Sequence, residues 1–250
     1  MDNDKLHIGT SGWSYKHWHH IFYPDDLTSA KYLEYYITQF DCVELNSSFY
    51  HLPLNTTVEG WMRRTPPDFI FCPKLSRYIT HQLRLNNAQE ALERFFGIFD
   101  IMKSRLGPVL IQLPPGLRFE GNKVRSFFNI LNQYYGEYRF ALEIRHKSWI
   151  TDEAFKILEE NRIAFTIADS GERYPYYETT TTDFVYLRFH GNGQLYASDY
   201  NPNELTEYAR KIGKWLEEGK QVWVFFNNDI HGYAVQNARS LNERMKVMKE

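Results

Sequence analysis

Eight short apolar runs along this chain each finish on polar or charged residues, and this pattern restricts the folds open to it. The runs are Leu6 to Ser11, Cys42 to Asn46, Phe69 to Lys74, Val109 to Leu113, Phe140 to Arg145, Ala164 to Asp169, Phe184 to His190 and Val222 to Asn228. An apolar run of this length is typical of a buried parallel strand. The polar endings indicate that the carboxyl end of each strand meets solvent, and we look for function there.

Segments with helical spacing separate the runs. In Ser29 to Phe40, apolar residues recur every three and four positions, the period of a helix with one buried face. The same spacing predicts helices over Thr56 to Arg64, Ala88 to Leu106, Asn122 to Tyr135, Asp152 to Asn161, Asn203 to Glu218 and Ala234 to Met248. Ser170 to Asp183 contains Pro175 and a threonine run instead. We therefore expect an irregular connection between the sixth and seventh strands.

Alternating strands and helices favour parallel βαβ units, because a parallel connection needs a long crossover. Eight such units in 250 residues predict an α/β fold of the closed (β/α)₈ type, an eight-stranded TIM barrel forming a single domain over residues 1–250. The alternative is an open doubly wound sheet, whose usual G-x-G-x-x-G turn is absent from the sequence. In a TIM barrel the active site lies at the carboxyl ends of the strands.

Composition limits the partners of the protein. The formal net charge of −2 gives no bulk attraction to nucleic acid or to an acidic membrane surface, so a local cluster must hold any anionic ligand. Cys42 and Cys72 both lie inside apolar runs, which suits a reducing compartment. Met1 to Lys5 is polar, unlike a secretory signal, and no run reaches the length of a membrane span. We expect a cytoplasmic protein without a membrane partner or an obligate protein partner.

The two-residue period of a strand sorts the polar strand ends into pairs. Because residues two apart share a face, Glu143 lies with Arg145 and Arg188 with His190. The other paired or single polar groups are Glu44 with Asn46, Cys72 with Lys74, Thr10 or Ser11, Gln112, Asp169 and Asn227. These groups form either a buried lattice of mutually neutralised charges or a site for a ligand. A lattice is costly to desolvate, which favours the functional interpretation.

Seven short motifs, in order along the chain, resemble the YecE-like family. They are Gly9-Thr10-Ser11-Gly12-Trp13, Val43-Glu44-Leu45-Asn46-Ser47-Ser48-Phe49-Tyr50, Thr80-His81, Gln112-Leu113-Pro114-Pro115, Glu143-Ile144-Arg145-His146-Lys147-Ser148-Trp149, Arg188-Phe189-His190-Gly191 and Phe226-Asn227-Asn228. The resemblance covers essentially the whole chain. It implies a TIM barrel but no reaction, since the family is a domain family of unknown function.

The first functional hypothesis is an enzyme, such as a phosphoester hydrolase, that acts on a phosphate-bearing or nucleic-acid-derived substrate. The cationic groups that match phosphate oxygens are Lys74, Arg145 and Arg188. His190 or His81 is the proton-transfer group, oriented by Glu143 or Asp169. A variant of this hypothesis places a divalent metal on Glu44, Glu143, Asp169 and His190.

Two alternatives stay open. One is a glycoside hydrolase that uses Glu44 and Glu143, since two carboxylates about 5–10 Å apart are required for that reaction. The other is a non-catalytic module that binds a nucleotide or single-stranded nucleic acid. The remaining candidate ligand-binding residues, which serve any of these functions, are Gln112, Asn46, Asn227, Trp13, Tyr50 and Trp149. For Trp149, a ligand platform and a packing role are both open.

Overall fold

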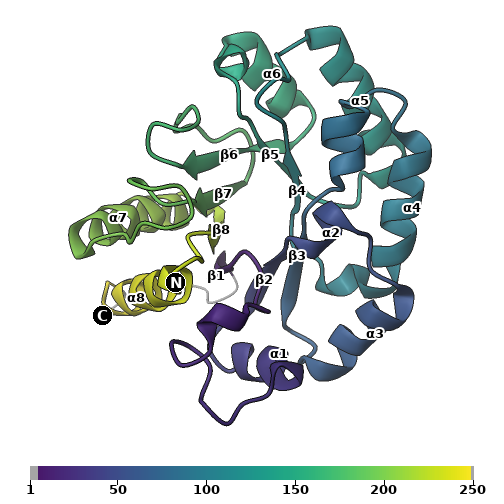
Figure 1. The fold of residues 1–250 in the computed structure, drawn as a ribbon. Helices are drawn as coiled ribbons and strands as arrows, with labels where there is room; N and C mark the ends of the chain where they lie inside the picture. The colour runs from purple at the N-terminus through teal and green to yellow at the C-terminus, as the bar shows by residue number, and fades with distance from the viewer. Residues whose placement is uncertain (1–4, 249–250) are drawn as a thin grey trace. The chain divides into compact units, whose positions relative to one another are not determined.

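A computed structural model describes residues 5–248 (Figure 1). Each of the eight apolar runs forms a strand. The strands are β1 (Leu6–Thr10), β2 (Cys42–Leu45), β3 (Ile70–Pro73), β4 (Val109–Gln112), β5 (Phe140–Glu143), β6 (Ile163–Asp169), β7 (Phe184–Phe189) and β8 (Gln221–Phe226). The polar N-terminal segment noted above lies outside the described residues except for Lys5.

The α-helices within residues 5–248 are α1 (Tyr32–Tyr36), α2 (Ser47–Tyr50), α3 (Asn55–Arg64), α4 (Gln89–Phe99), α5 (Gly121–Tyr135), α6 (Asp152–Glu160), α7 (Pro202–Glu217) and α8 (Tyr233–Val247). Seven of these helices form where the spacing predicts them, although α1 covers only five residues of the expected Ser29 to Phe40. The sequence did not predict the short α2 or the π-helix η4 (Tyr78–Gln82). The long helix expected from Ala88 ends as α4, and the 3₁₀-helix η5 (Asp100–Arg105) follows it.

The strands form an open parallel sheet, so the expected closed eight-stranded TIM barrel is wrong. Six strands pair in the order β1-β8-β7-β6-β5-β4, and β2 pairs with β3 in a separate two-stranded sheet. The order descends from β8 to β4 without the reversal that defines a doubly wound sheet. The hydrogen-bonded ladder is missing between β1 and β2 and between β3 and β4, where only isolated bridges occur.

A tyrosine hydroxyl separates β1 from β2. Tyr36 Oη accepts a hydrogen bond from Thr10 N at 3.0 Å and donates one to the Cys42 carbonyl at 3.1 Å. It therefore occupies backbone groups that a direct ladder would pair. The strands still approach closely, since a side chain at Gly9 would meet the Cys42 carbonyl at 2.4 Å.

A shift of register interrupts the pairing of β3 with β4. Isolated bridges join Phe71 to Leu106 and Lys74 to Leu110. The second bridge is three residues further along one segment but four residues further along the other. The extra residue acts like a bulge. Pro73 and Pro108, which lie between these bridges, have no N–H to donate to a ladder. The sequence pattern of eight strands predicts neither interruption.

The chain divides into two compact units. Unit 1 holds the described parts of Met1–Glu44 and Asp183–Glu250 together with Ile167–Tyr176, and unit 2 holds Leu45–Thr166 and Tyr177–Thr182. In unit 1, α7 and α8 lie side by side and α8 packs on β1 and β8 (Figure 1). In unit 2, α3 packs on α4, and α5 packs on α6.

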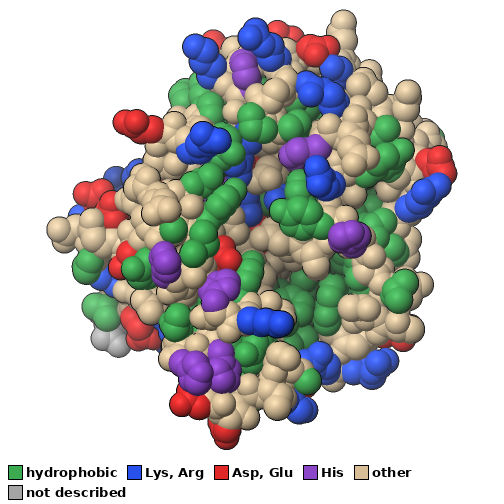
Figure 2. All heavy atoms as spheres, in the orientation of Figure 1, with side chains coloured by type: hydrophobic (Ala, Val, Ile, Leu, Met, Phe, Trp, Pro, Cys, Tyr) green, Lys and Arg blue, Asp and Glu red, His purple; other side chains and the backbone are tan. Residues whose placement is uncertain are grey.

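Other global features agree with the composition. Positive and negative side chains are interspersed on the face drawn in Figure 2, as the net charge of −2 leads one to expect. Cys42 and Cys72 are buried free thiols. Within residues 5–248, no helix combines the length and the apolar character needed to cross a membrane.

Replacing Tyr36 by Phe tests the role of its hydroxyl. We expect Tyr36→Phe to lower the free energy of unfolding by about 1–3 kcal/mol, because buried backbone groups of Thr10 and Cys42 lose their partner. Urea denaturation followed by circular dichroism measures this change. Tyr35→Phe is the matched control, since the hydroxyl of this half-buried neighbour makes no hydrogen bond within residues 5–248. Equal losses in the two variants would contradict the assignment.

Candidate functional site

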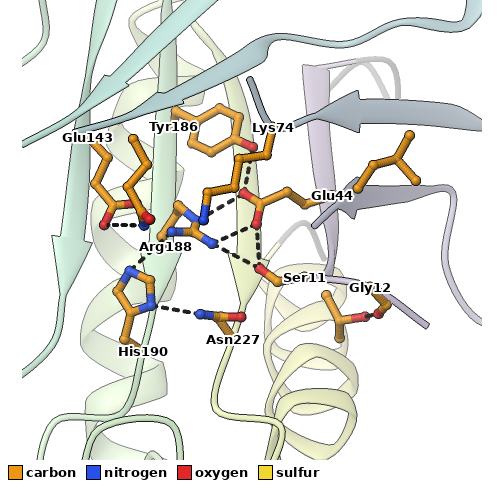
Figure 3. A network of polar contacts seen from close by, with 12 residues as sticks. Ser11, Gly12, Glu44, Lys74, Glu143, Tyr186, Arg188, His190 and Asn227 are labelled. Atoms are coloured by element: carbon orange, nitrogen blue, oxygen red, sulfur yellow. Dashed lines mark hydrogen bonds and ion pairs between the residues drawn. The ribbon is translucent and has the colours of Figure 1, made fainter. Parts of the chain in front are cut away.

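A buried ion pair between Glu44 and Arg188 organises the polar residues of unit 1 (Figure 3). Arg188 donates from Nε to Glu44 Oε2 at 2.9 Å and from Nη2 to Oε1 at 2.6 Å. Both side chains are fully buried. The pair is therefore bidentate, the geometry in which a guanidinium binds a carboxylate most strongly.

Neighbouring hydroxyls complete the environment of the Glu44 carboxylate. Ser11 Oγ donates to Oε1 at 2.6 Å, and Tyr186 Oη donates to Oε2 at 2.9 Å. Tyr186, Arg188 and His190 alternate along β7, which places all three side chains on one face. The isolated bridge between Ser11 and Glu44 brings the ends of β1 and β2 together at the same point.

His190 is a neutral acceptor in this network. Its Nε2 lies 3.3 Å from Arg188 Nη1, which can only donate, so Nε2 carries a lone pair. The other ring nitrogen, Nδ1, lies 3.0 Å from Asn227 Nδ2. His190 thus stabilises the orientation of Arg188 and would have to leave it to accept a proton from a ligand.

Asp169 holds the end of β6 in unit 1. Its backbone carbonyl accepts from His190 N at 2.7 Å, and its carboxylate accepts from Tyr208 Oη at 2.9 Å. Burial, with the Asp169 charge as the second cause, raises the pKa of Tyr208 well above its usual value. Asp169 therefore orients His190 through the backbone, and its carboxylate binds a tyrosine that stays protonated.

The ion pair with Glu44 occupies the edge of Arg188 that could bind a phosphate. Both Nε and Nη2 of the guanidinium, which form this edge, donate to Glu44. The carboxylate of Glu44 in turn accepts hydrogen bonds from three side chains. The Glu44–Arg188 cluster is therefore a buried set of mutually neutralised charges, one of the two arrangements that the sequence allowed.

A second cluster in unit 2 joins the ends of β4 and β5. Arg145 Nε donates to Glu143 Oε1 at 2.6 Å, and Gln112 Nε2 donates to the same oxygen at 3.1 Å. The expected pairing of Glu143 with Arg145 on one face is thus present. Glu143 is fully buried, whereas 7% of Arg145 is exposed.

Lys74 and His81 both contact the ring of Phe49. Lys74 Nζ lies 3.9 Å from the Phe49 ring centroid, a cation–π contact. The rings of Phe49 and His81 meet edge to face at 5.1 Å. Thr80 Oγ1 lies 2.9 Å from His81 Nδ1. The short helix α2 and the π-helix η4 place these side chains, since Phe49 lies on the former and His81 on the latter.

His81 is held neutral by its surroundings. Burial, followed by the positive charges of Lys74, Arg77 and Arg145, lowers the pKa of His81 from 6.5 to about 4. At neutral pH its imidazole therefore offers one donor and one acceptor. Its ring is only partly buried, so a ligand from solvent can reach it.

The remaining predicted residues have varied surroundings. Trp149 is 1% exposed and donates to the Leu117 carbonyl at 2.9 Å, which favours the packing role over a ligand platform. Tyr50 is 61% exposed beside Phe49. Asn46 precedes α2 and its carbonyl accepts from Phe49 N at 3.2 Å. Trp13 is half-buried, and its carbonyl accepts a hydrogen bond from the Tyr23 hydroxyl.

Several residues of these clusters were not predicted. Tyr186 lies two residues before Arg188, so the same two-residue period could have found it. Arg77 and Phe49 lie on short irregular or helical segments without a strand period. Within residues 5–248, no three His, Cys, Asp or Glu side chains gather in a manner suited to a metal ion.

Comparison with known proteins places the chain among relatives that match most of its length. A family model described as "Protein of unknown function DUF72" matches residues 7–250. The UPF0759 protein YunF of Bacillus subtilis (strain 168) is 24% identical over 272 residues, covering 97% of this chain and 95% of YunF. The UPF0759 protein YecE of Escherichia coli (strain K12) is 30% identical over 141 residues, 56% of this chain and 48% of YecE. The match to YecE therefore spans about half the length of that protein.

Solved structures support the fold. A DUF72 family protein from Thermotoga maritima MSB8 is 31% identical, with a TM-score of 0.87 over 98% of this chain and 99% of that one. A DUF72 family protein from Enterococcus faecalis V583 has a TM-score of 0.83 at 21% identity, covering 96% of this chain and 95% of that one. The second comparison shows a shared fold alone.

Removing one partner of the buried ion pair tests its structural role. We expect Glu44→Gln to lower the free energy of unfolding by about 3–5 kcal/mol, because Arg188 keeps an uncompensated buried charge. The double variant Glu44→Gln/Arg188→Met should recover much of this loss. Urea denaturation of the wild type, both single variants and the double variant gives the coupling energy.

Glu243→Gln supplies the control for that measurement. Glu243 pairs with Lys246 on α8 of the same unit, and both side chains are 68% exposed. Its loss should cost about 0–1 kcal/mol. If Glu44→Gln costs no more than Glu243→Gln, the buried pair does not stabilise unit 1.

Proposed function

The chain belongs to the DUF72 family, and we propose that its unit 2 binds a phosphate-bearing small molecule beside His81. One feature carries the proposal: His81 is only partly buried, and after burial itself the groups that lower the pKa of its ring are the cations Lys74, Arg77 and Arg145. Such a concentration of cations beside an accessible neutral imidazole suits an anion. Phosphate is favoured because Arg and Lys side chains match its oxygens.

The chemistry of the site follows from the charges. A bound phosphate offsets the positive potential on His81, which raises the pKa of its ring and makes it a better base. In the hydrolytic form of the proposal, water attacks phosphorus while His81 accepts one of its protons. The ester P–O bond breaks, the leaving oxygen takes a proton from water, and the His81 imidazolium returns its proton to solvent. Thr80, 2.9 Å from His81 Nδ1, would orient the ring for this step.

The predicted cations have different roles in this proposal. Arg188 and Arg145 are each paired with a buried glutamate, so neither binds the ligand directly. Lys74 and Arg145 add positive potential at His81, and the exposed Arg77 supplies the cation that contacts the ligand. A glycoside hydrolase would need Glu44 and Glu143 to touch a sugar. The geometry gives that alternative less support, because both carboxylates are fully buried and each is paired with an arginine.

Arg77 offers the clearest test, because it is exposed and its removal leaves the core intact. We expect Arg77→Ala to weaken binding of inorganic phosphate roughly 5-fold, since a charge at about 4 Å in water contributes about 1 kcal/mol. Isothermal titration calorimetry at low ionic strength measures the dissociation constant. Arg63→Ala is the control, since Arg63 is a 70% exposed residue of α3 in the same unit.

The outcomes separate binding from catalysis. If the wild type binds no phosphate, or Arg77→Ala binds it as tightly as Arg63→Ala, the proposed site is wrong. Hydrolysis of p-nitrophenyl phosphate then distinguishes the two forms of the proposal. Loss of hydrolysis in His81→Gln with phosphate binding retained supports an enzyme, whereas binding without hydrolysis in the wild type supports a binding module.

A further inference from the structure

A cavity of about 260 Å³ opens on unit 2 next to the π-helix η4. Its walls include Leu52, Tyr78, Leu83, Asn87 and Glu90. These residues come from the chain after α2, from η4 and its end, and from the start of α4. None of them belongs to the cationic cluster beside His81.

The cavity nevertheless lies beside that cluster, because the same two segments build both. Phe49 and His81 are in ring contact. Leu52 follows Phe49 by three residues and Leu83 follows His81 by two, spans of at most about 11 Å and 7 Å. A small molecule with a phosphate against His81 can therefore place an adjoining group in the cavity.

The cavity suits a flat ring with polar edges. Tyr78 is 48% exposed and presents an aromatic face, and Leu52 and Leu83 supply apolar surface. Asn87 adds an amide at the wall, a group that hydrogen-bonds the edge of a nucleobase. Glu90 and Arg94, which also line the cavity, are paired with each other. At about 260 Å³ the cavity is smaller than the roughly 300–1,000 Å³ that drug-sized ligands occupy, so it fits one ring system.

The backbone around the cavity is fixed before any ligand arrives. Three residues of this turn have the left-handed backbone conformation that residues other than glycine seldom adopt. They are Arg84, Leu85 and Asn87, with φ of 52°, 70° and 47°. Arg84 Nη2 donates to the Gly116 carbonyl at 2.6 Å, and Leu85 N donates to the Ile79 carbonyl at 3.0 Å. Leu85 is also buried at 3% exposure. These contacts hold the strained turn in place, as in a preformed ligand site.

From this juxtaposition we propose that the cavity holds the base of a nucleoside monophosphate whose phosphate lies against Arg77 and His81. The base stacks on Tyr78, and Asn87 faces its polar edge. This inference rests on the proposed phosphate site and narrows its ligand from any phosphate to a nucleotide.

Three probes test the phosphate, the sugar and the base of the ligand in turn. They are inorganic phosphate, ribose 5-phosphate and AMP. Titration calorimetry on the full chain should show AMP binding roughly 10-fold or more tightly than ribose 5-phosphate, because a stacked base contributes measurably to affinity. Tyr78→Ala should reduce AMP affinity to that of ribose 5-phosphate and leave phosphate affinity unchanged. Tyr78→Phe should keep AMP affinity, since stacking needs only the ring.

Tyr134→Ala controls for loss of an exposed tyrosine, since Tyr134 is 51% exposed on α5 of the same unit. Equal affinities of the wild type for AMP and ribose 5-phosphate, or AMP binding unaffected by Tyr78→Ala, would overturn the nucleotide assignment while phosphate binding still supports the anion site. A loss of ribose 5-phosphate binding in Tyr78→Ala as large as that of AMP would assign the cavity to a sugar and contradict the base. Absence of phosphate binding would remove both proposals together.

Discussion

The bidentate contact between Glu44 and Arg188 is the interaction on which the polar architecture of unit 1 depends. Two opposite charges without solvent exposure are stable only when both are fully hydrogen-bonded, and Ser11, Tyr186 and His190 complete the set. Residues at the ends of β1, β2 and β7 are thereby held at one point. Because an isolated bridge replaces the hydrogen-bonded ladder between β1 and β2, this network reinforces the contact between the two strands.

The charged cluster of unit 1 is buried, whereas His81 in unit 2 is accessible to solvent, and the two suit different roles. In unit 1 the cation is matched by a carboxylate, and the histidine is fixed as an acceptor by the arginine. In unit 2 burial, followed by the charges of three cations, lowers the pKa of His81. Perturbed ionisable groups accessible to solvent are the ones that ligands exploit. We therefore place the proposed ligand site at His81 and assign Arg188 and Glu44 a structural role.

The sequence predicts the local structure well and the closure of the sheet poorly. Apolar runs and helical spacing locate all eight strands and most helices, and the two-residue period brings Arg188 to His190 and Glu143 to Arg145. Tyr36 has the spacing of any core residue on a helix, so nothing marks its hydroxyl as the group between β1 and β2. A π-helix of five residues has no period long enough to detect, which hides the placement of His81 beside Phe49.

Nuclear magnetic resonance of the histidine rings compares the two clusters in one experiment. In the free protein His81 should titrate with a pKa of about 4, and inorganic phosphate should raise that pKa because the anion offsets the charges of Lys74 and Arg77. The ring signals of His190 should not respond to phosphate, since Arg188 is bound to Glu44. A pKa of His81 near 6.5 that phosphate leaves unchanged, with a response at His190 instead, would contradict the assignment of the ligand site to unit 2.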